Sequence, residues 1–570
     1  MLTPKPRSLP LFAWMFGILA LSILIGLPLF QGAMLNTHDS FLCLTRIACV
    51  KKAWLEGQLF PRWASDMIFG YGYPILNFYQ PSFQYLAGLL SFFTKNIVEA
   101  QNLASFLVYF SSGITMFIFT ASLWGRPAGF LAAAAYLFFP YHLTDLYIRG
   151  AYTELTAFAL LPFILWSLKR LADTLKTRYL LSLTCGITLL SLSHNITNML
   201  FLPWLGLFSA ILLLTRKESR LEFFFKTGAA FVFGFGLASF FILPAILEQK
   251  YVQIDKITSG QYDFHQNFLA LNQLTKWIWH YTGPGQGPYS GVSFELGIVH
   301  LALLLLALVW AIKYWQNSAT PKHLLIFFLA MGLVSLFMTT SWSLPVWNQL
   351  PFLKFVQFPS RFLVLTGLAL SVLIGFCTAG LKKNHTIALV TIGVILLAGI
   401  NFAYCRPAST QNPALVNNTL DVRATPPGEN GEFLPVSFKQ LRWPRSPNAA
   451  DIWKGEGQIL AHHAITSIQH EFTITARTPV LVGLNTFYFP GWTVREQKQE
   501  IPLIKDSPYG LIFFTLPAGE HHLEVRFGNT PLRQLAALLS LASLLGLLTL
   551  VVLIKKRNWL ANKKQTGETA

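Results

Sequence analysis

The first membrane-length apolar run of this chain is LPLFAWMFGILALSILIGLPLF, at residues 9–30, and the polar segment Asn36-Thr37-His38-Asp39-Ser40 follows it closely. At about 1.5 Å of rise per residue, the run is long enough to span a bilayer as a helix. Asp39 should therefore lie just beyond the membrane boundary, at the depth of lipid headgroups and their phosphates. A membrane enzyme that acts on lipid-linked substrates would hold its acid or base at this depth.

The composition indicates a membrane protein. Of 570 residues, 53% are hydrophobic and only 12% are charged, whereas soluble domains are roughly 25% charged. The net charge of +18 does not indicate nucleic-acid binding, because most basic residues lie in short clusters between apolar runs, which is how membrane topology is encoded. Residues 9–30 exceed the apolar core of a signal peptide, so we expect them to remain as an uncleaved anchor.

The apolar runs predict a polytopic α-helical membrane protein with about twelve transmembrane helices. These runs cover residues 9–30, 101–123, 127–141, 153–168, 179–194, 197–215, 225–247, 294–313, 322–340, 361–380, 384–402 and 531–554. If both termini are cytoplasmic, alternation of the spans places every strong basic cluster on the cytoplasmic side, as the positive-inside rule requires. The apolar segment 82–94 is too short to span the membrane, so we expect it to be interfacial or re-entrant.

The first outer loop, residues 31–100, is unusually long. The pattern of apolar and charged residues from Ser40 to Gly57 predicts an amphipathic helix that would lie on the membrane. Arg46 is among the charged residues of its polar face. A region rich in glycine, proline and tyrosine follows this helix. Tyrosines such as Tyr79 anchor proteins at membrane interfaces and also stack on sugar rings, and both interpretations remain open.

The loop and later segments carry an ordered set of motifs. They are His38-Asp39, GQLFPRW (57–63), GYGYP (70–74), NFYQP (77–81), LYIRGAYTE (146–154), LSHN (192–195) and FVQFPSRFL (355–363). In this order the chain resembles a bacterial multispan membrane family labelled "6-pyruvoyl-tetrahydropterin synthase related". That family is similar to the GT-C superfamily of polytopic glycosyltransferases.

The resemblance implies transfer of a sugar from a polyprenyl-phosphate donor, with an acidic residue of the first outer loop in the active site. Asp39 occupies the matching position. The chain departs from the superfamily pattern because His38 stands where a second acid often lies. A divalent metal is therefore a possible cofactor rather than an expected one, and the metal ligands are unknown.

Asp39 and His38 are the candidate catalytic residues. Displacing a phosphate from the anomeric carbon of a sugar requires a base for the acceptor and groups that stabilise the departing phosphate. Asp39 is the candidate base, although an aspartate before a helix is also a common N-cap. His38 is either a partner of Asp39, a metal ligand, or a hydrogen-bonded interfacial histidine.

Further polar residues at the outer helix ends are candidate substrate-binding residues. They are Arg62, Tyr79, Arg149, Glu154, His194 and Arg361. The planar fork of an arginine suits phosphate, so Arg149 and Arg361 are candidate contacts to the donor phosphate. Alternatives are snorkelling of the arginines to headgroups, an ion pair between Arg149 and Glu154, and a helix-end role for His194.

Three regions follow from these patterns. Residues 1–402 form the GT-C-like transmembrane domain, 403–530 a β-rich extracytoplasmic domain, and 531–570 the last span with a basic cytoplasmic tail. Strand-like alternation and turn residues in the second region predict a β-sandwich. PGW (490–492) and LPAGEHHLEVRF (516–527) resemble the terminal module of related glycosyltransferases, which could bind an acceptor or act as a lid.

The predicted function is a glycosyltransferase of the bacterial inner membrane, expected to be of inverting type, that acts in synthesis of the cell envelope. Its expected partners are a lipid-linked sugar donor, membrane lipids and a glycan or lipid acceptor, with no nucleic acid. A lipid or glycan transporter, or flippase, is the main alternative, but the spans carry few of the midplane charges that ion-coupled transporters use. A non-catalytic assembly subunit is a further alternative.

Overall fold

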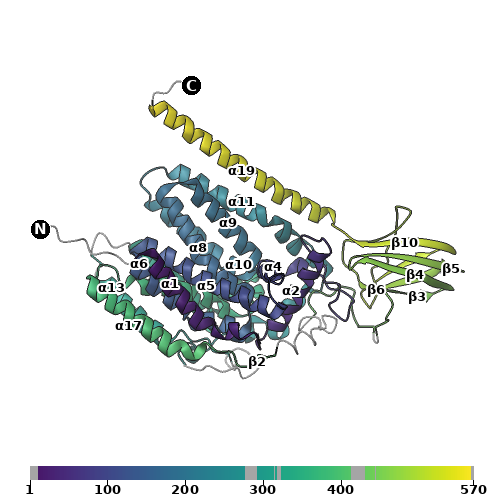
Figure 1. Cartoon of the computed structure of the whole chain (residues 1–570), viewed down its shortest axis with the longest axis horizontal. Helices are drawn as coiled ribbons and strands as arrows, with labels where there is room; N and C mark the ends of the chain where they lie inside the picture. Colours follow the sequence, from purple (N-terminus) through teal and green to yellow (C-terminus); the bar gives the residue numbers. More distant parts are fainter. Residues whose placement is uncertain are drawn as a thin grey trace.

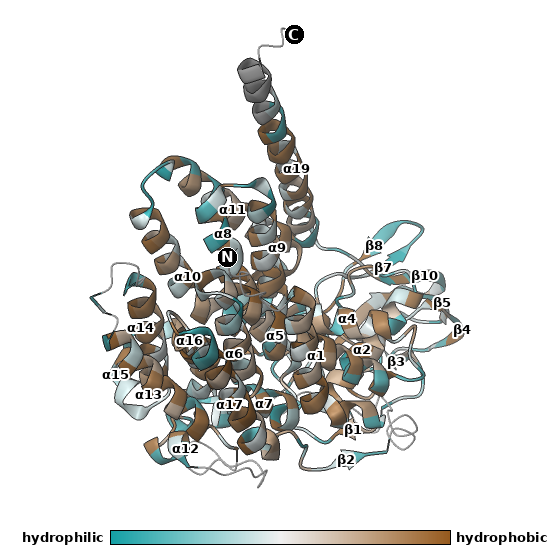
Figure 2. Ribbon diagram, turned by 60° about the vertical axis from the view of Figure 1, so that its left-hand side comes forward, coloured by the Kyte–Doolittle hydropathy of each residue, from teal (hydrophilic) through white to brown (hydrophobic). Residues whose placement is uncertain are grey.

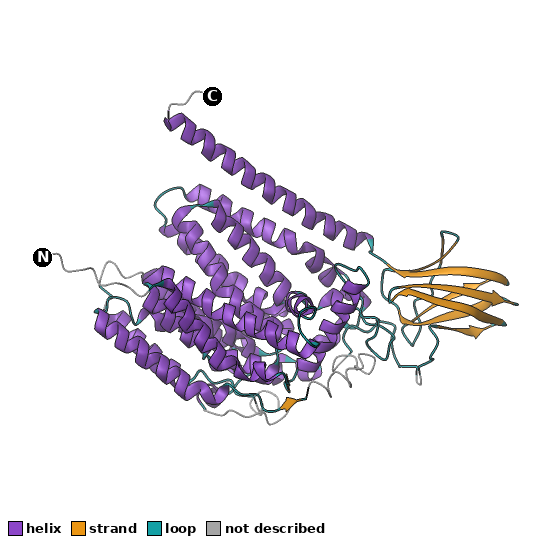
Figure 3. Ribbon diagram, in the orientation of Figure 1, coloured by secondary structure: helices purple, strands orange, loops and turns teal. Residues whose placement is uncertain are grey.

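The protein consists of a large bundle of helices and, at one end of it, a group of β-strands (Figures 1 and 3). The computed structural model describes residues 10–276, 292–313, 315–316, 322–412, 431–442 and 445–566. Helices are the expected form of a chain surrounded by lipid, because they satisfy every internal backbone hydrogen bond within one segment. Figure 2 shows apolar residues along the long helices and a hydrophilic hairpin between β7 and β8.

The helices of the bundle are mostly long and apolar, and those in the loops are short and more polar. They are α1 (Leu11–Gly26), α2 (Ser40–Leu55), α3 (Ile75–Phe78), α4 (Ser82–Leu90), α5 (Ile97–Trp124), α6 (Arg126–Leu137), α7 (Pro140–Thr144), the π-helix η2 (Asp145–Arg149), α8 (Tyr152–Thr174), α9 (Thr177–Ser193), α10 (Asn195–Thr215), α11 (Arg220–Leu247), α12 (Leu271–Thr275), α13 (Ile298–Lys313), α14 (Lys322–Met338), α15 (Leu344–Gln349), α16 (Leu363–Phe376), α17 (Lys383–Asn401) and α19 (Pro531–Thr566).

Each predicted transmembrane run coincides with a helix. Within the described residues, eight helical segments are long and apolar enough to cross a membrane, and they contain α1, α5, α8, α10, α11, α16, α17 and α19. The other predicted runs correspond to α6, α9, α13 and α14, which have 12, 17, 16 and 17 residues. The polytopic helical architecture is therefore confirmed, and α4, with nine residues, is too short to span, as predicted.

Basic residues gather at the helix ends that lie away from Asp39. α8 begins beside the Asp39 loop and ends near Lys169 and Arg170, and α11 begins in the next basic cluster. Lys226 of α11 donates a hydrogen bond to the carbonyl of Leu175, just after α8, so the two basic ends lie together. The directions of these helices follow the predicted alternation.

The prediction for α2 is wrong in one respect, which is the face on which Arg46 lies. Arg46 was expected on an outward, polar face, but its side chain is buried, with 7% of the residue exposed. α2 packs against α4 and α5, and the guanidinium of Arg46 lies over the ring of Tyr79, between α3 and α4. The helix itself lies where the sequence predicts it.

The C-terminal strands form two antiparallel sheets. One has the order β4-β5-β10-β7-β8 and the other β3-β6-β9, with Leu523 of β10 opposite Phe472 of β5. Alternate residues of both sheets, such as Ile474 and Val482, are fully buried in one apolar core, which is the arrangement of a sandwich. The strands are β3 (Ala450–Lys454), β4 (Gly457–Thr466), β5 (Gln469–Ala476), β6 (Val480–Phe487), β7 (Trp492–Glu496), β8 (Gln499–Ile501), β9 (Leu511–Leu516) and β10 (Gly519–Phe527).

The first loop is joined to distant parts of the chain at two places. Near its start, β1 (Met34–Leu35) pairs with β2 (Thr410–Gln411), which follows α17. Farther along, Trp63 inserts among Trp492 and Phe527 of the sandwich, with ring centroids 5.6 and 5.5 Å away. The first loop therefore connects the helical bundle to the β-sheets.

The last helix, α19, packs against α11 through small residues. Ser540 of α19 accepts a hydrogen bond from the backbone N–H of Phe240 and contacts the Ser239 hydroxyl at 3.0 Å. A Cβ at Gly236 would lie only 2.1 Å from the Ser543 hydroxyl oxygen. Small residues at such interfaces allow membrane helices to approach closely.

We predict that Gly236→Ile lowers the thermal stability of the purified protein in detergent, by an overpacking cost of about 1–3 kcal/mol. Gly228→Ile is the matched control, because Gly228 is on the same helix and a Cβ there meets nothing within 4 Å. Unfolding temperatures of both variants test the contact. Equal temperatures would show that α19 does not pack on α11 at this position.

Candidate functional site

Two backbone hydrogen bonds hold Asp39 beside Arg149. The N–H of His38 donates to the carbonyl of Ile148 at 3.1 Å, and the N–H of Asp39 donates to the carbonyl of Arg149 at 3.0 Å. Gly150 has a positive φ of 65°, and a Cβ there would lie 2.1 Å from the Thr37 hydroxyl oxygen. Only glycine fits this close approach, so the turn after η2 is shaped to receive the first loop.

The carboxylate of Asp39 is left available by this arrangement. Asp39 occupies the N-cap position of α2, yet its side chain makes no capping hydrogen bond. The N–H of Ser40 donates to the Thr37 hydroxyl at 3.2 Å instead, and the Ser40 hydroxyl contacts that of Tyr152 at 2.8 Å. In the described residues the Asp39 side chain has no hydrogen-bond or ion-pair partner, and the residue is partly exposed. The capping interpretation is therefore not the role that its side chain fulfils.

Arg149 is anchored by an acidic cluster in the turn between α7 and α8. Its Nη1 donates to Glu154 Oε2 at 2.8 Å, to the Tyr141 hydroxyl at 2.7 Å and to Asp145 Oδ1. Asp145 and Glu154 are fully buried, and Tyr141 donates to the other oxygen of Glu154 at 3.1 Å. The predicted ion pair between Arg149 and Glu154 is thus present.

This anchoring uses only one nitrogen of the guanidinium. Within the described part of the chain, Nη2 and Nε of Arg149 donate no hydrogen bond, and 16% of the side chain is exposed. A planar pair of donors therefore remains for an anionic group, while the carboxylates behind it fix the orientation of the plane. Ion pairing and phosphate binding are compatible roles for this arginine.

Arg361 and His194 approach the same cluster from other helices. Arg361, just before α16, donates to the Val356 carbonyl at 2.7 Å and to Gln357 Oε1 at 2.8 Å. Its charge acts on both Asp39 and Glu154. His194 caps α10 by accepting from the N–H of Thr197 at 3.3 Å, which is the helix-end alternative, and it lies within electrostatic range of Glu154.

Burial dominates the electrostatics of the two aspartates. It raises the pKa of Asp39 above the ordinary value, against the opposing charges of Arg46, Arg149, His38 and Arg361. Burial, together with the nearby charge of Glu154, raises the pKa of Asp145 well above its ordinary value, against the charge of Arg149. Asp39 therefore binds a proton more tightly than a solvated aspartate, which makes it a stronger base when ionised.

Tyr79 reaches this site through Arg46. The guanidinium carbon of Arg46 lies 3.6 Å from the centroid of the Tyr79 ring, a cation–π contact. Asp39, Cys43 and Arg46 are spaced so that they share one face of α2. That spacing was visible in the sequence, but the assignment of Arg46 to the polar outer face concealed it.

Tyr141 and Asp145 were also missed as site residues. Asp145 precedes Arg149 by four residues, the spacing of an ion pair within a helical turn, so the sequence contained a signal for it. Tyr141 gave no such signal, because its hydroxyl reaches Arg149 and Glu154 only through the fold of the α7–η2 turn.

Arg62 lies in a different network. Its guanidinium donates to Asn77 Oδ1 at 2.8 Å and to the Phe240 carbonyl at 2.6 Å. Asn77 donates to Glu248, which is paired with the buried Arg533 at 3.0 Å. The structure does not bring Arg62 together with Asp39, and its contact to the donor remains a prediction from the sequence.

His38, beside Asp39, is the residue that the sequence offers as a candidate metal ligand. His38 is exposed, and its charge lowers the pKa of Asp39. The residues that the structure describes contain no group of three or more histidine, cysteine, aspartate or glutamate side chains arranged to hold a metal ion.

We predict that Arg46→Gln raises the pKa of Asp39 further, because it removes the largest of the charges that lower it. The measurement is the pH profile of carbodiimide labelling at Asp39, read by mass spectrometry, since carbodiimides react with the protonated carboxyl. The labelling midpoint of the wild type should lie above that of an ordinary aspartate, and the midpoint of the variant higher still. A lower midpoint in the variant would show that Arg46 does not act on Asp39.

Comparisons with known proteins give a family and several partial similarities. A 26% identical segment of 265 residues is shared with an uncharacterized protein of Lactococcus lactis subsp. cremoris (strain MG1363), covering 45% of this chain and 42% of that protein. This chain thus matches less than half the length of that relative.

Two solved structures are similar over most of this chain at low identity. Arabinofuranosyltransferase AftD from Mycobacteria is 15% identical, with a TM-score of 0.47 over 71% of this chain and 28% of that chain. The oligosaccharyltransferase AglB from the archaeon Archaeoglobus fulgidus is 13% identical, with a TM-score of 0.43 over 76% of this chain and 63% of that chain.

The family model described as "6-pyruvoyl-tetrahydropterin synthase related domain; membrane protein" matches residues 76–405. This range begins inside the first loop and ends just after α17. It includes Tyr79, the η2 turn with Arg149, and Arg361, so most of the cluster around Asp39 falls within it. Because the match covers more than half of the chain, the protein belongs to the 6-pyruvoyl-tetrahydropterin synthase related family of membrane proteins.

Proposed function

We propose that this protein is a membrane glycosyltransferase that transfers a sugar from a polyprenyl-phosphate donor to a cell-envelope acceptor. The reaction takes place on the extracytoplasmic face of the bacterial inner membrane, with Asp39 as the base. The observation that carries the proposal is the free carboxylate of Asp39, which lies within electrostatic range of Arg149 and whose backbone is hydrogen-bonded to that of Arg149.

The transfer replaces one bond at the anomeric carbon of the sugar by another. Asp39 removes the proton from an acceptor hydroxyl, and the acceptor oxygen then forms a bond to the anomeric carbon. The bond from that carbon to the phosphate oxygen breaks, and the polyprenyl phosphate leaves with the electron pair. Attack from the side opposite the phosphate inverts the configuration at this carbon.

The cations around Asp39 suit the leaving group. Nη2 and Nε of Arg149 form a fork for two phosphate oxygens, and Arg361 adds a second charge near Asp39. Fixed donors of this kind stabilise charge that develops in the transition state without having to reorganise. Glu154 and Asp145 act on the reaction indirectly, as positioning residues that hold Arg149.

The distribution of charge supports the proposed side of the membrane. The cluster around Asp39 lies at the opposite helix ends from the lysine and arginine clusters of α8 and α11. Basic clusters are retained in the cytoplasm, so the cluster around Asp39 belongs outside. A polyprenyl-phosphate sugar that lies in the outer leaflet would present its phosphate at this depth.

We predict that Asp39→Asn reduces sugar transfer roughly 100-fold or more, the usual effect of losing a general base. The assay uses purified protein in proteoliposomes with labelled polyprenyl-phosphate sugars and an extract of cell-envelope acceptors. Asp173→Asn is the matched control, because Asp173 is an exposed acid near the end of α8 that lies away from the Asp39 loop, and it should retain full activity.

Two results would contradict the proposal. Unchanged transfer by Asp39→Asn would remove Asp39 as the base. Absence of transfer by the wild type with every donor would favour the transporter or the non-catalytic subunit. Movement of fluorescent polyprenyl-phosphate lipid between leaflets, measured in the same proteoliposomes, then separates those two alternatives.

We further predict that Arg149→Lys lowers kcat roughly tenfold or more, because lysine keeps the charge but loses the planar fork. Lysine can still pair with Asp145 and Glu154, so the unfolding temperature should change little. Normal kcat in this variant would show that a single charge is sufficient and that the fork does not bind the phosphate.

A further inference from the structure

A second site lies between the first loop and the β-sheets, away from Asp39. It is a cavity of about 800 Å³, within the range of small-molecule sites. α2 contributes Lys52 and Glu56 from its C-terminal end, the first loop contributes Asp66, and strands β4 and β5 contribute His462 and His470. None of the residues grouped around Asp39 lines it.

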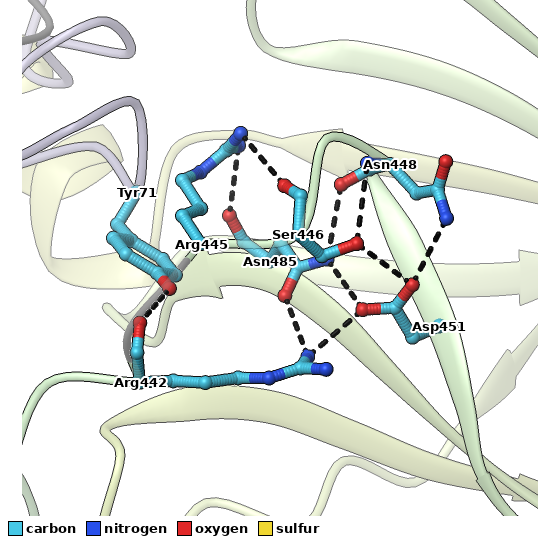
Figure 4. A network of polar contacts seen from close by, with 7 residues as sticks. All are labelled: Tyr71, Arg442, Arg445, Ser446, Asn448, Asp451 and Asn485. Atoms are coloured by element: carbon cyan, nitrogen blue, oxygen red, sulfur yellow. Dashed lines mark hydrogen bonds and ion pairs between the residues drawn. The ribbon is translucent and has the colours of Figure 1, made fainter.

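One wall of this cleft is built by the polar network shown in Figure 4. Asp451 accepts hydrogen bonds from Arg442 at 2.8 Å and from Ser446 at 2.9 Å, and Asn448 and Asn485 donate to it as well. The Tyr71 hydroxyl of the first loop donates to the Arg442 carbonyl at 2.7 Å. A network with this many mutual contacts is rigid, so the wall exists before any ligand arrives.

The end of α2 and the first loop are also joined to the sheets. Glu56 accepts from the N–H of Ser467 at 3.1 Å, in the turn between β4 and β5. Between Asp66 and Tyr71 the backbone passes through left-handed conformations at Ile68 (φ 55°) and Phe69 (φ 57°). Such strain in residues other than glycine persists only where the surrounding structure enforces it, and it is concentrated at functional sites.

The charges that line the cleft are already compensated. Lys52 pairs with Asp66 at 2.6 Å. Arg445 donates to the carbonyls of Gly70 at 3.0 Å and Ser446 at 3.2 Å. The two cations that line the cleft, Lys52 and Arg445, are matched in number by the acids Glu56 and Asp66, so the lining carries no net charge. The cleft is therefore suited to a neutral ligand that forms many hydrogen bonds.

Histidines provide an aromatic surface on the β4 side. The ring of His462 stacks on that of Phe472, with centroids 4.6 Å apart and planes inclined by 19°, and His462 Nε2 lies 3.2 Å from His470 Nδ1. Burial lowers the pKa of both histidines, which keeps them neutral at pH 7. Flat neutral rings beside hydroxyl and amide groups match the apolar faces and hydroxyl edges of sugars.

We propose that this cleft binds a neutral oligosaccharide. Its identity as the acceptor of the transfer rests on the proposed function, whereas the binding itself does not. Asp39 and Glu56 stand at opposite ends of α2, about 25 Å apart at 1.5 Å per residue. A single sugar cannot reach both sites, but a chain of several sugars held in the cleft can extend one end towards Asp39.

The test measures binding without catalysis. Labelled full-length protein in detergent is applied to an array of neutral and anionic bacterial surface oligosaccharides, with unstructured peptides printed beside them. The strongest neutral glycan is then titrated by calorimetry. Because Asp39→Asn leaves the cleft intact, this variant should bind like the wild type, so failure of the proposed catalysis and failure of the cleft are distinguishable.

His462→Ala should weaken binding roughly tenfold, by loss of the stacking surface. His463→Ala is the matched control, since His463 is the next residue of the same exposed strand and does not line the cleft, and it should bind normally. Ala464→Trp, which fills the cleft from an exposed position opposite His470 on the same face of β4 as His462, should abolish binding. Equal binding by both histidine variants, binding only to anionic glycans or peptides, or no binding to the array would overturn the proposal.

Discussion

The ion cluster in which Arg149 contacts Asp145 and Glu154 is the interaction on which the candidate site depends. Both carboxylates are fully buried, so removing their common partner would leave uncompensated charge inside the protein, at a cost of about 3–5 kcal/mol. The cluster holds the turn that ends at Gly150, and this turn receives the first loop. The position of Asp39 therefore depends on the ion pairs that Arg149 makes with Asp145 and Glu154.

α2 links the two proposed sites. Its first turn begins at Asp39, and its C-terminal end contributes Lys52 and Glu56 to the cleft against the β-sheets. The helix is buried along most of one face, and Trp63 just beyond it is embedded in the core of the sandwich. α2 therefore connects the loop that carries Asp39 to the cleft beside the β-sheets.

Local sequence patterns predicted the elements well and their faces less well. The apolar runs identified every long helix of the bundle, because a segment in lipid must be apolar and must satisfy its own backbone. The strand-like alternation within residues 403–530 likewise predicted a β-rich region, which contains the paired strands β5 and β10. Arg46 was placed on the wrong face because amphipathicity cannot distinguish a polar face that meets water from one that meets a half-buried tyrosine of another segment.

The sequence by itself determined that this is a polytopic membrane protein with a β-rich C-terminal region and an acid just beyond its first span. Those properties depend on hydrophobicity and on spacing within single segments. Tertiary structure alone decided that the loop of Asp39 is hydrogen-bonded to the turn at Arg149, that Arg62 belongs to a separate network with Glu248, and that Tyr141 completes the cluster. These contacts join residues whose relative positions follow from the packing of several elements, and no local pattern encodes that packing.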